Sequence, residues 1–126
     1  MQAEVTASDF DAPDLLDMLE SSLTSAFDNL PFGVITMDRD GDVVGFNEYE
    51  SSRSGIDANR VLGRNFFESV GPCTNNYLIA QRFHDETELD ETLDFVFTLR
   101  MAPTPVRLRL LARSDSQRQF LIVMNR

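Results

Sequence analysis

The sequence of 126 residues lacks several features that define common classes of protein. It has a single cysteine, so no disulfide within the chain can stabilise the fold, and it contains neither tryptophan nor lysine. No apolar run approaches the roughly 18 residues that a membrane-spanning helix needs. The acidic N-terminus carries no basic stretch of the kind that begins a secretory signal. These absences favour a protein of the reducing cytoplasm.

Positive charge is also scarce, because 11 arginines stand against 21 acidic residues and the formal net charge is −10. Binding to nucleic acids or to anionic membranes requires clustered basic side chains that neutralise phosphate groups. We therefore expect neither kind of partner. The acidity is typical of a highly soluble surface, and we expect a monomer or a weak dimer.

What is present fits one folded domain with one hydrophobic core, since 42% of the residues are apolar. Residues 1–28 form an acidic segment in which apolar residues recur at helical spacing. They are Leu15, Leu16, Leu19, Leu23 and Phe27. This pattern predicts one amphipathic helix or two short ones, which form either a permanently docked cap or a detachable one. We therefore divide the single domain into an N-terminal helical cap, 1–28, and a core, 29–126.

The core begins with two short apolar stretches, 34–37 and 43–46, which predict the strands of a hairpin around the turn 38–42. Aspartates at alternate positions of this turn resemble the start of a calcium-binding loop. The twelfth position of such a loop requires a bidentate Glu, and here it is Tyr49. We expect no metal site.

The rest of the core shows a clear order of elements. Residues 47–62 predict short helical turns, and 76–87 predict one helix with Tyr77, Ala80 and Phe83 on one face. Apolar and polar residues then alternate along three further stretches, as in half-buried strands. These stretches are 92–101, 106–110 and 119–124. The order predicts an α+β fold of the PAS type, with a five-stranded antiparallel sheet, helices on one face and a pocket between them.

Cys73 lies in the sequence Gly-Pro-Cys-Thr, directly after the apolar stretch 65–70. A lone cysteine is most often a small buried apolar residue, so its position alone assigns no chemistry. One chemical alternative is an enzyme in which Cys73 is the nucleophile and His84 the base. His84 follows eleven residues later among acidic residues, and no glycine motif for an oxyanion hole supports this reading. We expect a protein that is not an enzyme.

The segment around Cys73 resembles the chromophore-attachment segment of the photoactive yellow protein family. The resemblance covers roughly residues 15–126. It is carried by 30–35, Asp40-Gly41, Phe46-Asn47, Glu50, Gly55, Gly63, 65–67, 70–74, Phe83, Phe95, Phe97, Met101, Pro103, Thr104 and Val106. It implies a blue-light photoreceptor that carries p-coumaric acid as a thioester on Cys73 and signals to a downstream protein.

The resemblance also implies the roles of individual residues. Glu50 and Ser54 correspond to a Glu and a Thr near the phenolate oxygen of the chromophore, and we expect both to form hydrogen bonds with it. The expected lining of the chromophore pocket is Ile35, Phe46, Phe66, Val70, Thr74, Phe97 and Met101. Burial beside an anion raises the pKa of a carboxyl group, so Glu50 is expected to be neutral in the dark and to donate its proton after light-driven isomerisation.

Two positions depart from the family. Phe46 stands where the family has a Tyr that donates to the phenolate, and Ile56 stands where it has an Arg. Arg53 and Arg100 are candidates to replace that Arg. Neither can be placed from the sequence, so we expect ionised Glu50 to have no compensating cation in its apolar surroundings. Its burial then favours release of the cap, which is held only by a few leucines and Phe27, and this release is the expected signal. The alternative to a photoreceptor is a PAS module without chromophore, which binds another ligand or mediates dimerisation.

Overall fold

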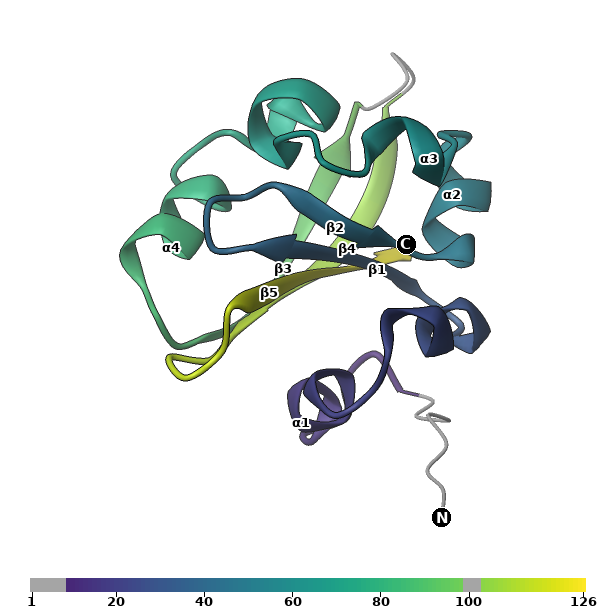
Figure 1. Ribbon diagram of the computed structural model, residues 1–126. Coiled ribbons are helices and arrows are strands. Elements are labelled where there is room, and N and C mark those ends of the chain that lie inside the picture. Colours follow the sequence, from purple (N-terminus) through teal and green to yellow (C-terminus); the bar gives the residue numbers. More distant parts are fainter. Residues whose placement is uncertain (1–8, 99–102) are drawn as a thin grey trace.

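The computed structural model describes residues 9–98 and 103–126, and these form a five-stranded antiparallel sheet with helices (Figure 1). The order of strands across the sheet is β2-β1-β5-β4-β3. The strands are β1 (Gly33–Asp38), β2 (Val43–Phe46), β3 (Leu89–Phe97), β4 (Thr104–Ala112) and β5 (Arg118–Asn125). The prediction of an α+β PAS fold is thereby confirmed.

The turn between β1 and β2 is built by Asp38 and Gly41. The Asp38 carboxylate accepts hydrogen bonds from the backbone N–H groups of Asp40 and Asp42, at 2.9 and 3.0 Å. Gly41 has a φ of +91°, a conformation that glycine adopts without steric cost. The aspartate at the head of the calcium-like spacing thus holds the tight turn of the hairpin.

One face of the sheet is covered by the helices that precede β3 (Figure 1). They are α2 (Glu48–Ser54), α3 (Ala58–Val61), the π-helical turn η2 (Phe66–Val70), the 3-10 turn η3 (Pro72–Thr74) and α4 (Ala80–Asp85). Between them and the sheet lies the larger of two apolar clusters, which includes Ile35, Leu110 and Leu121. We call it the pocket-side cluster.

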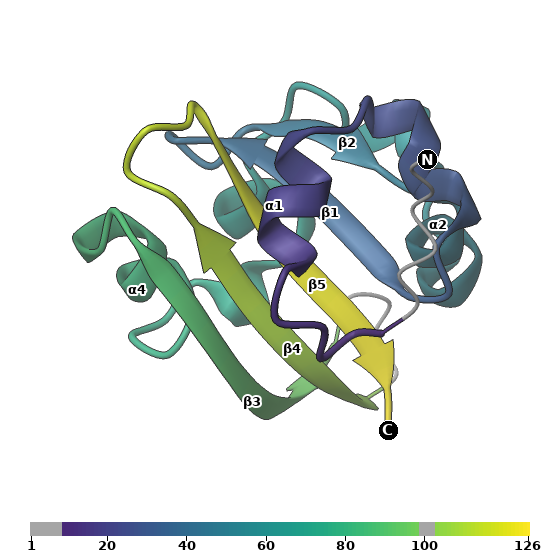
Figure 2. The ribbon, with the colours of Figure 1, turned by 90° about the horizontal axis from the view of Figure 1, so that it is seen from below.

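The opposite face carries the N-terminal segment (Figure 2). Helix α1 (Leu15–Glu20) and the 3-10 helix η1 (Thr24–Asn29) are two short elements, one of the two forms that the sequence predicted. Their apolar side chains form the cap-side cluster with side chains of the sheet. It consists of Phe10, Leu15, Leu19, Phe27, Leu30, Phe32, Val34, Leu111, Phe120 and Ile122. Leu23 was expected on this face, but its side chain is 78% exposed because it lies between the two helices.

Arginines of the sheet also hold the N-terminal segment. Arg109 of β4 is buried and donates to the backbone carbonyls of Phe10 and Ala12, at 2.9 and 2.8 Å. Its other N–H groups bind both carboxylate oxygens of Asp90 on β3. Arg118 of β5 donates to carbonyls at the end of α1. The expectation that leucines and Phe27 alone hold the cap was therefore wrong.

Two predicted elements differ in extent. The helix expected over 76–87 is shorter, because the Asn76 side chain accepts hydrogen bonds from the N–H groups of Leu78 and Ile79 and turns the chain before α4 begins. Tyr77 is consequently 76% exposed instead of facing the core. The strand expected over 92–101 begins earlier, at Leu89, where it pairs with Ala112 of β4.

No helix in the described part of the chain is both long and apolar enough to cross a membrane.

Candidate functional site

The candidate site is organised by helix α2, whose first turn is fixed by Asn47. The Asn47 side chain is buried and accepts hydrogen bonds from the N–H groups of Glu50, at 3.2 Å, and Val34, at 2.9 Å. This is the N-cap arrangement, in which a side-chain oxygen satisfies a free N–H at the start of a helix. Because Asn47 also binds β1, it fixes α2 against the sheet and sets the position of Glu50.

Glu50 points into the protein and has no exposed surface. One of its carboxylate oxygens lies so close to the backbone of β1 that a Cβ atom on Gly33 would approach it to 2.2 Å. Any other residue at position 33 would force the Glu50 carboxyl group to move. Burial raises the pKa of Glu50 above its usual value, in the direction expected from the sequence.

A cation lies beside this carboxyl group. Arg53, three residues further along α2, donates from Nε to Glu50 Oε1 at 3.0 Å and from a terminal nitrogen to the second oxygen, Oε2. The Arg53 side chain is only 6% exposed, and its guanidinium lies 5.3 Å from the centre of the Phe97 ring. Arg53 opposes the rise in the pKa of Glu50. The expectation of a buried Glu50 without a compensating cation was therefore wrong for the chain alone.

Cys73 is half-buried in η3 and packs against the pocket-side cluster. The structure brings most of the residues expected around the chromophore into this one cluster. They are Ile35, Phe46, Phe66, Val70 and Phe97. Thr74 is buried beside Cys73, and its hydroxyl donates to the carbonyl of Gly71 at 2.6 Å. Met101 lies outside the described residues.

Ser54 uses its hydroxyl within α2. It donates to the backbone carbonyl of Glu50 at 2.7 Å and accepts from the N–H of Ile56 at 3.2 Å. Since a hydroxyl has one hydrogen to donate, Ser54 can bind a phenolate only by giving up the first of these bonds. Its role as a donor stays a prediction.

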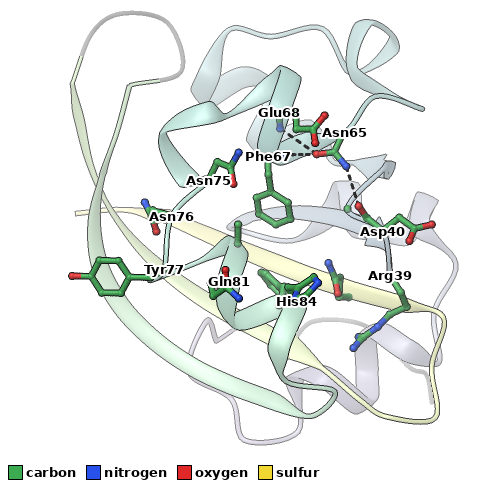
Figure 3. Close-up of a pocket in the computed structure, with 14 residues that line it drawn as sticks. Arg39, Asp40, Asn65, Phe67, Glu68, Asn75, Asn76, Tyr77, Gln81 and His84 are labelled. Carbon is green, nitrogen blue, oxygen red and sulfur yellow. Dashed lines mark hydrogen bonds between the residues drawn. The ribbon is translucent and has the colours of Figure 1, made fainter.

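A separate surface pocket of about 440 Å³ lies between the β1–β2 turn and the segment that leads into α4 (Figure 3). Asn65, Phe67, Gln81 and His84 line it, whereas Cys73 and Glu50 do not. His84 is exposed and lies 3.1 Å from its sequence neighbour Asp85. The structure thus gives His84 a carboxylate partner and places it in a pocket that the residues of the candidate site do not line.

Comparison with known proteins identifies the family to which this fold belongs. The family model of the PAS fold matches residues 22–126. Photoactive yellow protein of Halochromatium salexigens is 35% identical over 101 residues, which cover 75% of this chain and 81% of that protein. The chain belongs to the photoactive yellow protein family. The corresponding protein of Rhodobacter capsulatus is 31% identical over 103 residues, covering 76% of this chain and 80% of the relative.

A solved structure from the photoactive yellow protein family also resembles this one. The photoactive yellow protein domain of the sensor histidine kinase Ppr from Rhodospirillum centenum superposes with a TM-score of 0.78 and 38% sequence identity. The match covers 86% of this chain and 98% of that domain. Fold and family are thus established.

The sequence analysis did not predict the ion pair of Arg53 with Glu50 or the hydrogen bonds by which Asn47 fixes α2. Glu50 and Arg53 are three residues apart, a spacing that brings side chains together on a helix, so their pairing could have been read from the sequence. Asn47 precedes α2 and is a preferred N-cap residue. Its further hydrogen bonds reach Phe27 and Phe32, 20 and 15 residues earlier, and no local pattern signals them.

Proposed function

We propose that this protein is a blue-light photoreceptor of the cytoplasm that carries p-coumaric acid as a thioester on Cys73. The observation that carries the proposal is the placement of Cys73 against the pocket-side cluster, which also contains Phe46, Phe66 and Phe97. Apolar and aromatic side chains suit a planar aromatic ligand. The buried pair of Glu50 and Arg53 supplies the polar groups that a phenolate oxygen would need.

Cys73 would attach the chromophore by nucleophilic substitution. Its thiolate sulfur attacks the carbonyl carbon of an activated p-coumaroyl donor, the C–S bond forms, and the leaving group departs with the electron pair of the broken bond. The proton of the thiol goes to solvent. When bound, the p-coumaroyl group would absorb blue light and isomerise from trans to cis about its double bond.

Glu50 would hold a proton in the dark and lose it in the light. A buried carboxyl group next to a phenolate is favoured in its neutral form, both by desolvation and by the like charge. In that form it can donate a hydrogen bond. Isomerisation would change the geometry of this bond and raise the proton affinity of the phenolate, so that Glu50 would give up its proton to the phenolate oxygen and become ionised.

Asn47 offers a direct connection from Glu50 to the N-terminal cap, residues 1–28. Its side-chain amide donates to the carbonyl of Phe27 at 2.8 Å and to that of Phe32 at 3.0 Å, while its oxygen holds the first turn of α2. A displacement of α2 after ionisation of Glu50 would strain these bonds. We infer that the signal is partial release of the cap, which exposes the cap-side face of the sheet to a downstream signalling protein.

Reconstitution tests the chromophore assignment. Purified protein treated with an activated ester of p-coumaric acid should turn yellow and gain the mass of one coumaroyl group. Because Cys73 is the only cysteine in the sequence, Cys73→Ser leaves no other thiol to react and should show neither change. Hydroxylamine, which cleaves thioesters, should reverse both in the wild type.

Two results would contradict the proposal. A Ser variant that becomes coloured and mass-shifted would remove Cys73 as the attachment site. Wild-type protein that stays colourless after treatment would leave a PAS module without chromophore as the function.

A further inference from the structure

The buried ion pair of α2 has a consequence that depends on residues of this chain. Glu50 is fully buried and Arg53 nearly so, and the guanidinium binds both carboxylate oxygens while it lies over the Phe97 ring. Phe97 belongs to the same apolar cluster against which Cys73 packs. The cation is therefore inside the site proposed for the chromophore.

A guanidinium stays protonated at every pH that a protein tolerates, so Arg53 remains a cation in any state of the site. A buried charge is costly unless an opposite charge and hydrogen bonds compensate it. One buried cation compensates one anion, and a second anion in the same apolar surroundings would have no cationic partner among the described residues. In the chain alone that single anion is Glu50.

We propose that Arg53 is the cationic partner of the chromophore site and that it exchanges anions, binding the phenolate in the dark and Glu50 after the proton has moved. The proposal rests on the proposed function and names a binding residue for it. Before the transfer Glu50 is neutral, Arg53 carries +1 and the phenolate −1. Afterwards Glu50 carries −1, Arg53 +1 and the protonated ligand none, so the total charge stays zero.

The ion pair in this structure then has the charges of the state after proton transfer. Because Arg53 compensates ionised Glu50, less free energy remains to displace α2 and release the cap. Arg53 thus limits the size of the light response. Arg53 also replaces the hydrogen bond to the phenolate that Phe46, unlike a Tyr, cannot donate.

Three variants separate charge from size. Arg53→Gln removes the charge and keeps a hydrogen-bond donor, and Arg53→Lys keeps the charge without the bidentate geometry. Arg60→Gln, on an exposed arginine of α3, makes the same change in net charge outside the site and is the matched control. If Arg53→Gln fails to fold, Arg53→Met offers a neutral side chain of similar length for the same measurements.

The first measurement uses protein without chromophore. The Glu50 carboxyl is titrated by carbon-13 NMR, with Glu50→Gln to assign its signal. Loss of a charge-assisted hydrogen bond should raise the pKa of Glu50 by about one to two units in Arg53→Gln, less in Arg53→Lys, and not at all in Arg60→Gln. An unchanged titration in Arg53→Gln would overturn the ion pair and with it the proposal.

The second measurement uses reconstituted protein. The pH midpoint at which acid bleaches the yellow phenolate should rise by about one to two units in Arg53→Gln, and Arg53→Lys should recover part of this shift. An unshifted midpoint, together with a shifted Glu50 titration, would overturn the exchange and leave a fixed ion pair. Colourless wild-type protein would overturn the proposed function and the exchange, whereas the chromophore-free titration would still decide the pair.

Discussion

Glu50 is the residue whose burial has the clearest consequence for stability. Its pKa is raised in the folded chain, chiefly by desolvation, and stays near 4.5 in the unfolded chain. The folded state therefore holds its proton to higher pH than the unfolded state does. Stability from this group is complete below pH 4.5 and is lost as pH rises through the folded pKa.

We expect urea unfolding of chromophore-free protein to show this loss as a falling free energy of unfolding above pH 4.5. Glu50→Gln has no proton to lose and should remove that part of the slope. Glu48→Gln, at an exposed position of the same helix, is the control and should keep it. Identical slopes in the wild type and Glu50→Gln would mean that other groups set the pH dependence.

Phe46 is the second residue whose proposed effect on the site can be tested. It pairs with Ile35 across the hairpin and belongs to the pocket-side cluster, and the family resemblance implies a Tyr that donates to the phenolate at this position. In Phe46→Tyr the added donor should lower the acid-bleaching midpoint of reconstituted protein by about one to two pH units. The measurement is a visible titration beside the wild type. An unmoved midpoint would show that existing donors already saturate the phenolate.

At the scale of elements, Asn47 couples the start of α2 to η1 and to the chain before β1. Asn47→Ala removes an N-cap and leaves the carbonyls of Phe27 and Phe32 without this donor. The expected loss of stability is about 2–4 kcal/mol, from about 1 kcal/mol for the cap and 1–3 kcal/mol for the unpaired buried groups.

Asp57→Ala is the matched control for this change. Asp57 caps α3 through the N–H of Asn59 at an exposed position, so only the contribution of the cap, about 1 kcal/mol, should be lost. Urea unfolding of both variants measures the difference. Equal losses would show that the hydrogen bonds of Asn47 to the N-terminal segment contribute nothing.

Arg109 is the corresponding connection between β4 and the N-terminal segment. Arg109→Met keeps much of the apolar stem but removes the donors to Phe10 and Ala12, each worth about 1.5–3 kcal/mol as hydrogen bonds to a charged group. Amide hydrogen exchange in residues 9–20 should become at least about tenfold faster in the dark.

Arg107 provides the control for this variant. It lies on the same strand, is exposed, and pairs with Asp94. Arg107→Met removes a charge that interacts with Asp11 but leaves the hydrogen bonds of Arg109 to Phe10 and Ala12 in place, so exchange in 9–20 should change much less than in Arg109→Met. A similar acceleration in both variants would assign the effect to net charge and not to the bonds that Arg109 makes.

Elements with strong local signals were predicted well. Alternation and turn residues predicted three sets of features that the structure contains. These are the two strands of the first hairpin, the glycines after α2 and α3, and the last two strands. Tyr77 and Leu23 were placed wrongly because each fits a helical spacing that the chain interrupts nearby, at Asn76 and between α1 and η1. Contacts between distant segments, such as Arg109 with Phe10, have no local signature.

Most residues of the candidate site were predicted from the family resemblance and not from the periodicity of the sequence. Spacing alone could not bring Cys73, Phe46 and Phe97 into one cluster, because they lie on three elements far apart in sequence. The burial of Glu50 followed from the implied pocket. The spacing on α2 made Arg53 a candidate partner of Glu50, but Arg100 was a candidate too. The position of the Arg53 guanidinium over the Phe97 ring supports Arg53, whereas Arg100 lies outside the described residues.

The whole molecule carries a net charge of −10, and this should govern its response to salt. Repulsion among like charges is stronger in the compact state than in the unfolded chain, and salt screens it. Surface pairs such as Arg107 with Asp94 are screened too, but each contributes little.

Raising NaCl from 0.05 to 1 M should therefore raise the melting temperature of chromophore-free protein. A gain of about 1 kcal/mol corresponds to roughly 3–6 °C for a chain of this size. Most of the rise should occur below about 0.3 M, because the Debye length is already near 10 Å at 0.1 M. A melting temperature that falls with salt, measured by scanning calorimetry, would mean that the surface ion pairs outweigh the repulsion.

The central position of β5 determines when the two apolar clusters can form during synthesis of the chain. Side chains of β5 alternate between the two apolar clusters, with Phe120 and Ile122 on the cap side and Leu121 and Val123 on the pocket side. Ribosomes synthesise this strand after the other four. Until it emerges, neither cluster is complete, so Cys73 stays accessible and the cap has no finished surface on which to dock. The proposed chromophore site would be unformed until then, and we expect attachment to follow the emergence of β5 from the ribosome.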